Sequence, residues 1–202
     1  MSLLVNGLPN CIFEGATINT DYRASVQFEL LMQDNSLDDA QKLYKALDLY
    51  LPQDAENIRV DQNLIDGIID FYTCKNHLSV LNHERAVRKD KEQESGGVLS
   101  KQIYSFEYDE GYIYSAFLAC YGVDLFDVKY LHWWKFKALF MSLPQECEFC
   151  KIMGYRSMTI NNKLPDEQKK FYRKMKRLYA LPDKRTAEQK EKDFINSLSA
   201  VI

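Results

Sequence analysis

The chain has 202 residues, 46 % of them hydrophobic and 13 % aromatic, so it can bury a core and is too apolar to be disordered. Eight glycines and five prolines disfavour an all-β fold with many turns. Residues 1–100 carry 9 basic and 16 acidic side chains and residues 101–202 carry 17 and 13, which gives −7 and +4 and a net charge of −3. This balance disfavours a DNA-binding domain, and the opposite charge of the two halves suits self-association.

The first half is expected to form a small β-hairpin or an extended arm over residues 3–18, followed by three helices. Either Thr20 or Asp21 can cap the first helix. The expected helices begin near Tyr22, run from Ser36 (with Asp39 at the capping-box position) to Pro52, and cover about residues 55–74. Helical spacing turns a set of apolar residues inward: Leu43, Leu47 and Tyr50 in the second helix, and Ile58, Leu64, Ile65, Ile68, Ile69 and Tyr72 in the third.

Residues 75–101 are rich in charge and contain Gly96-Gly97, which predicts a charged flexible linker. Further helices are expected over residues 108–122, 127–144, 146–155 and 165–180, and from Thr186 onward. Gly122 is typical of a helix end, and Asp127 is the expected cap of the helix that contains the two tryptophans. The predicted fold is therefore mainly α, with helical lobes at 1–74 and 102–202 joined by the linker; the alternative is one compact domain.

The two tryptophans of the chain are adjacent, in the stretch LHWWKFKALFMSLP at residues 131–144. On a helix their side chains point about 100° apart, so the two indoles must meet different neighbours. The favoured interpretation is a core helix that is packed on several sides. The alternative keeps one indole in the core and offers the other to a partner, because Trp is enriched at interface hot spots.

No arrangement of residues predicts catalysis, so we expect a protein that is not an enzyme and uses no cofactor. Cys147 and Cys150 form a C-x-x-C without a second ligand pair for zinc. The three histidines, His77, His83 and His132, are not spaced as a ligand set. Five cysteines, no signal-peptide pattern and no apolar run near about 18 residues predict a reduced cytoplasmic protein that spans no membrane.

The segment PDEQKKFYRKMKRLYAL at residues 165–181 predicts an amphipathic helix with one strongly basic side. Its apolar side, Phe171, Met175 and Leu178, is expected to be buried. The basic side is either a solvated surface or a docking site for an acidic protein partner; nucleic acid is the less favoured partner. The candidate partner-binding residues of the chain are Trp133, Trp134, Phe140, Lys170, Arg173, Lys174 and Arg177.

Several stretches resemble the phage protein family that carries the gene-product name "gp fifteen", from siphophages and prophages of Gram-positive bacteria. They are INTDYR (18–23), YSFEYDEGYIYSAFLACYGVDL (104–125), LHWWKFKALFMSLP (131–144), KIMGYRS (151–157) and KKFYRKMKRLYALPD (169–183). The resemblance implies a gene between those of the tail tube and the tape measure, and a tail assembly chaperone that binds the tape-measure protein. It implies no catalytic residues.

The resemblance also implies a protein of the host cytoplasm that is absent from the mature virion. Its expected partners are the tape-measure protein, further copies of itself and, as an additional candidate, the tail-tube protein. The alternative is a structural virion component, such as a head–tail joining or tail-completion protein.

Overall fold

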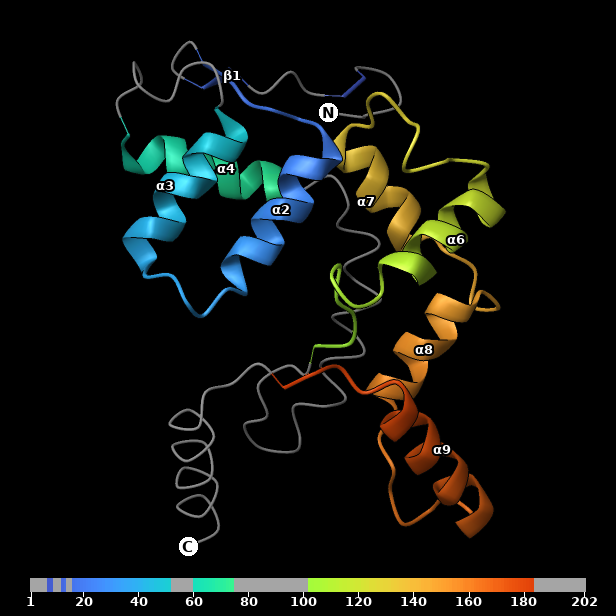
Figure 1. The fold of residues 1–202 in the computed structure, drawn as a ribbon. Coiled ribbons are helices and arrows are strands. Elements are labelled where there is room, and N and C mark those ends of the chain that lie inside the picture. Colours follow the sequence, from blue (N-terminus) through green and yellow to red (C-terminus); the bar gives the residue numbers. More distant parts are fainter. Residues whose placement is uncertain (1–6, 9–11, 14–15, 52–59, 75–101, 184–202) are drawn as a thin grey trace, which may run out of the picture.

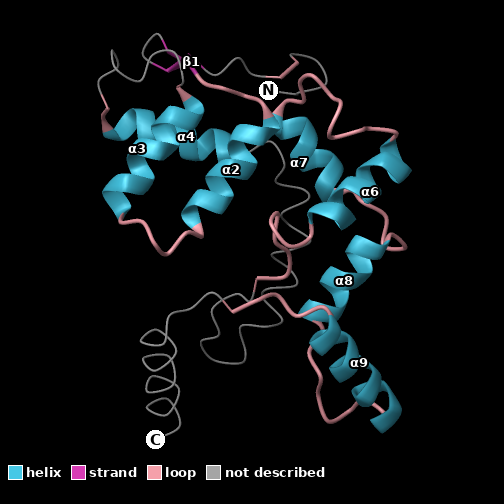
Figure 2. Ribbon diagram, in the orientation of Figure 1, coloured by secondary structure: helices cyan, strands magenta, loops and turns pink. Residues whose placement is uncertain are grey.

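The computed structural model describes residues 7–8, 12–13, 16–51, 60–74 and 102–183 (Figure 1). Within these ranges the chain is mainly α, which confirms the predicted fold class (Figure 2). The helices are α2 (Tyr22–Met32), α3 (Asp39–Tyr50), α4 (Gln62–Thr73), α6 (Glu110–Tyr121), α7 (Trp133–Met141), α8 (Glu148–Ser157) and α9 (Asp166–Leu178). The strands β1 (Ile12–Phe13) and β2 (Ala16–Thr17) pair antiparallel, with Ile12 opposite Thr17. The expected linker at 75–101 and the helix from Thr186 lie outside the described residues.

The helices α2, α3 and α4 lie together on one side of α7, while α6 lies on its other side (Figure 1). The closest packing joins α2 to α3 and α7, and α8 to α6 and α9. The last two helices, α8 and α9, continue away from this body, with α9 at its end (Figure 1).

Short polar residues start most of these helices, although three do not start where the sequence predicted. The helix expected over about residues 55–74 begins at Gln62 after its cap Asp61, and Ile58 lies outside the described residues. Asp21 caps α2 by accepting the Arg23 N–H at 2.9 Å. The capping box of α3 pairs Asp38 with Gln41, so the predicted start at Ser36 is two residues early. His132 rather than Asp127 caps α7, because the chain just before Trp133 is extended and pairs with the start of α2.

A single hydrophobic core collects residues from both halves of the described chain. Tyr22 of α2 stacks on Phe136 of α7 at 4.8 Å between ring centroids. Phe71 of α4 stacks on Trp134 of α7 at 6.2 Å. The division into two lobes stays a prediction, and the linker that would separate them lies outside the described residues.

Some apolar residues that helical spacing placed inward are exposed instead. Leu43 and Ile69 are 37 % and 45 % exposed, and Phe171 and Leu178 are 47 % and 64 % exposed. The expected burial of the apolar side of α9 is therefore wrong for Phe171 and Leu178. The reason is that α9 packs mainly on α8: Phe171 meets Tyr155 of α8 edge to face at 5.9 Å and is still about half exposed, and none of the residues of α9 is fully buried.

Among the described residues, no helix has the length and apolar character needed to cross a membrane.

Candidate functional site

The adjacent tryptophans close the C-terminal end of α4. The Trp133 Nε1–H donates to the carbonyl oxygen of Tyr72 at 2.8 Å, and the Trp134 Nε1–H donates to that of Phe71, also at 2.8 Å. The last four carbonyls of a helix have no partner within the helix, so side-chain donors stabilise its end. Lys137 Nζ adds a third contact, at 3.1 Å from the Tyr72 oxygen, and places a positive charge at the negative end of the helix dipole. We call these three side chains the tryptophan cap.

The tryptophan cap explains why two tryptophans stand side by side. Their indoles diverge on α7 and thereby reach two consecutive carbonyls of the last turn of α4. Their exposed fractions are only 3 % and 6 %. In the folded chain both indoles therefore lie in the core, as the favoured interpretation predicted.

Aromatic rings continue from the tryptophan cap through α7. Phe136 stacks on Trp133 at 5.6 Å and on Phe117 of α6 at 4.9 Å. Phe140, one turn later, is 5 % exposed and meets Phe149 of α8 at 5.4 Å. Phe140 thus belongs to the same core. A partner could reach the candidate residues Trp133, Trp134 and Phe140 only if the core repacked. Their role in partner binding stays a prediction.

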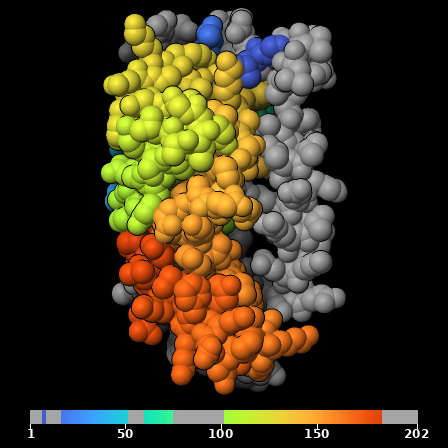
Figure 3. Space-filling view, turned by 90° about the vertical axis from the view of Figure 1, so that its right-hand side faces the viewer, coloured from blue at the N-terminus to red at the C-terminus, as the bar shows by residue number. Residues whose placement is uncertain are grey.

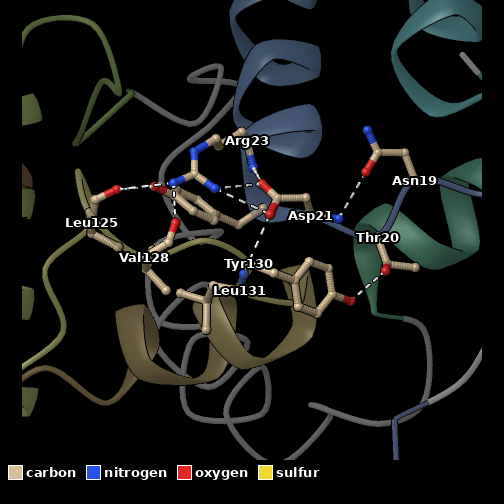
Figure 4. A network of polar contacts seen from close by, with 9 residues as sticks. Asn19, Thr20, Asp21, Arg23, Leu125, Val128, Tyr130 and Leu131 are labelled. Atoms are coloured by element: carbon tan, nitrogen blue, oxygen red, sulfur yellow. Dashed lines mark hydrogen bonds and ion pairs between the residues drawn. The ribbon is translucent and has the colours of Figure 1, made fainter.

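The segment INTDYR forms a second organised region, in which residues 19–23 pair with residues 125–132; we call it the junction (Figure 4). The Tyr22 N–H donates to the Leu131 oxygen and the Trp133 N–H to the Thr20 oxygen, both at 2.8 Å. The Arg23 guanidinium lies between the Asp21 carboxylate, at 3.3 Å, and the Val128 oxygen, at 2.6 Å. These bonds tie the start of α2 to the chain before α7.

A surface pocket of about 400 Å³ opens beside the junction. Its lining is Asn19, Asp21, Arg23, Ala24, Gln27, Asp48, Leu49 and Lys129. Small-molecule sites are usually lined by apolar and aromatic side chains with few polar groups. Most of the residues that line this pocket are polar or charged. We therefore assign no ligand to the pocket.

Next to the tryptophan cap, the half-buried carboxylate of Glu29 accepts hydrogen bonds from two tyrosines. The Tyr72 hydroxyl donates at 2.9 Å and the Tyr104 hydroxyl at 3.4 Å. Burial raises the pKa of Glu29 above its ordinary value, and the two hydroxyl donors and the charge of Lys137 only partly oppose this. The charged carboxylate is therefore less stable here than in water.

Replacing Glu29 with Gln should stabilise the protein at neutral pH, with an effect that disappears in acid. A carboxyl with a raised pKa in the folded state favours folding while it is protonated, and this contribution is lost as the pH rises through the folded pKa. Urea unfolding at pH 7 and at about pH 4, near the ordinary pKa of Glu, measures the difference. The exposed Glu146→Gln is the control and should change stability little at either pH. A Glu29→Gln effect that is equal at both pH values would contradict the assigned cause.

A buried ion pair joins the start of α6 to the end of α8. Arg156 donates from two nitrogens to the two oxygens of Asp109, at 2.6 and 2.8 Å, and the two side chains are only 7 % and 1 % exposed. Arg156 also donates to the Tyr179 oxygen just after α9, at 2.6 Å, and to the Ile103 oxygen at 3.1 Å. Asp109 in turn accepts the Ser105 N–H at 2.9 Å. This pair fixes α6, α8 and the end of α9 relative to one another.

The predicted basic surface lies on α9. Lys170, Arg173, Lys174 and Arg177 are all exposed, as the helical spacing indicated. Two other lysines of α9 have partners within the chain: Lys169 pairs with Asp166 at 3.2 Å, and Lys176 donates to the Arg156 oxygen at 3.2 Å. The four candidate partner-binding residues on α9 therefore face outward and share one side of the helix.

Residues 8–181 match the family described as Bacteriophage Gp15 protein. The chain belongs to this family. The match confirms the family that the sequence motifs indicated, and it covers the junction, the tryptophan cap, the Asp109–Arg156 pair and α9. Neither the search of curated proteins nor that of solved structures gave a match. As a Gp15 protein, the chain has a role in the structure or assembly of a bacteriophage.

The C-x-x-C of this Gp15 protein has a local structural role. Cys147 caps α8, since its sulfur accepts the Cys150 N–H at 3.4 Å. Burial raises the pKa of the Cys150 thiol to about 12, which keeps it protonated and unreactive at neutral pH. Within the described ranges no three His, Cys, Asp or Glu side chains gather as metal ligands.

Sequence reasoning did not identify the Asp109–Arg156 pair or the Glu29 site. Asp109 lies at the start of the helix expected over residues 108–122, where an acidic residue is common and needs no partner. Arg156 follows Ile152, Met153 and Tyr155 closely in the sequence, and this nearness to apolar residues was the available signal. Neither residue indicates which partner it takes.

Proposed function

We propose that this chain is a tail assembly chaperone that binds the tape-measure protein while a siphophage tail forms. Its partners would be the tape-measure protein and further copies of itself, with the tail-tube protein as an additional candidate. It would act in the host cytoplasm by binding alone, without catalysis. Membership of the Gp15 family supports the proposal, because it assigns the chain to phage structure or assembly.

The observation that carries the proposal is the exposed apolar side of α6. This helix is apolar around most of its circumference, yet only one side is covered, by Ile113, Ala116 and Phe117. On the rest of the circumference Tyr112 and Leu118, about 120° apart, are 38 % and 42 % exposed, and Tyr108, just before the helix, is 45 % exposed. A helix that is apolar all round is normally buried, so this side fits a partner.

Figure 3 views the molecule from the side on which α6, α8 and α9 lie, and their atoms form one continuous surface there. The exposed apolar residues Phe171 and Leu178 of α9 belong to the same set of helices. A tape-measure protein is a long helical chain with apolar stripes, and amphipathic helices bind by laying such a stripe on an apolar surface. Many weak contacts along one client add up through avidity.

Changing this surface should abolish the solubilising activity and leave folding intact. The test is co-expression with the tape-measure protein of the same phage, followed by separation of soluble and insoluble fractions. Wild type should keep the tape-measure protein soluble, whereas Tyr112→Ser combined with Leu118→Ser should not, although its thermal melt stays close to wild type. The control is Tyr44→Ser on α3, where the side chain is 71 % exposed. Equal solubilisation by wild type and the α6 double variant would refute the proposed surface.

A second experiment separates the chaperone from the virion component that is the alternative function. Mass spectrometry of purified particles should detect the tape-measure protein and not this chain if it acts only during assembly. A fixed number of copies per particle would instead favour a head–tail joining or tail-completion protein.

A further inference from the structure

The exposed side of α9 carries two stripes that lie next to each other. At about 100° per residue, Lys170, Arg173, Lys174 and Arg177 occupy one stripe roughly 100° wide. Phe171 and Leu178, which are 47 % and 64 % exposed, lie directly beside it. Solvated basic helices usually keep their large apolar residues covered, so a surface that shows both fits a partner with acidic and apolar groups.

The exposed side of α4 has the complementary composition. Asp66 is exposed and Asp70 is half-buried, one turn apart on the same side of the helix. Ile69 lies beside them and is 45 % exposed, and Val60, just before the helix, is 44 % exposed. Two acidic residues thus lie next to the exposed Ile69, and their one-turn spacing equals that between Lys170 and Lys174.

We propose that α9 of one copy docks on α4 of a second copy. The two helices lie at opposite ends of the molecule, so they cannot meet within one chain (Figure 1). Counting 100° per residue in chain direction, Phe171 and Leu178 lie after the basic stripe in rotation around α9. On α4, Ile69 lies before the acidic residues in the same sense of rotation. When the two helices run parallel, the basic residues of α9 therefore face the acidic residues of α4, and the apolar residues face each other.

This contact joins different surfaces of two identical chains, so it is heterologous. Each copy in a pair keeps an unused α9 surface at one end of the pair and an unused α4 surface at the other. Such a contact continues into a ring or an open array. One helix pair buries less area than a standard interface, so the contact is weak and depends on protein concentration and salt.

Charge reversal on each side tests the contact. One variant combines Arg173→Glu, Lys174→Glu and Arg177→Glu, and the other combines Asp66→Lys and Asp70→Lys. The control combines Asp127→Lys and Glu146→Lys, which are exposed acids away from α4. Circular dichroism and thermal melts check that each variant folds.

Sedimentation velocity at high protein concentration and low salt should show association for wild type and for the control. Each reversed variant alone should bind its own copies about tenfold or more weakly, because like charges then face each other. An equimolar mixture of the two reversed variants should associate again, because the acidic α9 of one then meets the basic α4 of the other.

Recovery in the mixture requires direct pairing of α9 with α4 between copies, and a mixture that stays monomeric overturns the proposal. A monomeric wild type at every concentration and salt also overturns it, and would indicate that the basic side of α9 binds an acidic segment of another protein. If the α9 variant fails to fold, the α4 variant alone tests the proposal, because the proposal requires this variant to lose self-association. The inference does not depend on the proposed function. A monomeric protein that keeps the tape-measure protein soluble would refute the docking of α9 on α4 and would still agree with the proposed chaperone function.

Discussion

Replacing Arg156 with Met should lower the free energy of unfolding by about 3–5 kcal/mol, because it leaves the buried Asp109 carboxylate without its counter-charge. The loss exceeds that of a surface pair because Asp109 is only 1 % exposed and water cannot replace the guanidinium. The same change removes the hydrogen bonds to the Tyr179 and Ile103 oxygens. Chemical denaturation in urea measures the difference.

The exposed pair on the same helix supplies the control. Lys151 lies 3.9 Å from Glu148, and both side chains are about half exposed, at 47 % and 53 %. Lys151→Met should cost no more than about 1 kcal/mol, which is typical of surface pairs. If Arg156→Met and Lys151→Met are equally mild, the Asp109–Arg156 pair does not hold α6 and α8 together as described.

Trp133→Ala and Trp134→Ala should each lower the free energy of unfolding by about 3–5 kcal/mol, the usual cost of removing a large aromatic side chain from a core. Each change also leaves a carbonyl at the end of α4 without its indole donor. Trp→Phe at the same positions keeps most of the packing and removes only the N–H. That exchange should cost less, about 1–3 kcal/mol for a buried group left unsatisfied.

The two Phe exchanges should differ from each other. The Tyr72 oxygen keeps Lys137 as a charged donor, whereas the remaining donor to the Phe71 oxygen among the described residues is the neutral Cys74 N–H at 3.2 Å. We therefore expect Trp134→Phe to cost more than Trp133→Phe. Tyr44→Ala, at a side chain 71 % exposed, is the control and should stay within about 0.5 kcal/mol of wild type. A tryptophan variant that melts like wild type and no longer binds the tape-measure protein would restore the partner-binding interpretation.

Helix content and the family could be predicted from the sequence because both depend on local patterns. Caps such as Asp21 and the stop at Gly122, where φ is 64°, follow from residue type and hold in the structure. The tryptophan helix was recognised as a core helix because it is apolar on several sides. The start of that helix was misplaced because Asp127 is a good cap by type, while a contact with residues 110 positions away keeps the chain extended up to His132.

Exposure and pairing could not be predicted, since both depend on what the rest of the chain covers. Periodicity shows that Phe171 and Leu178 share a side of their helix, but it does not show whether another element packs there. Ile69 of α4, which is 45 % exposed, could not be placed for the same reason. The partner of Asp109 is 47 positions away, and no local rule selects Arg156 among the other arginines.

The tryptophan cap has a consequence for the order in which the chain is synthesised. The carbonyls at the end of α4 receive their indole donors from residues 61 and 63 positions later in the sequence. At translation rates of about 5–20 residues per second, roughly 3–12 s pass before the ribosome has added the tryptophans. During that interval Phe71 and Tyr72 can already contact Tyr50 and Phe28, but α4 has neither its indole donors nor the two tryptophan rings that stack on it. The first half of the nascent chain therefore cannot complete the packing of α4 until the second half is made. Ribosome-bound chains that stop before residue 134 should stay sensitive to protease.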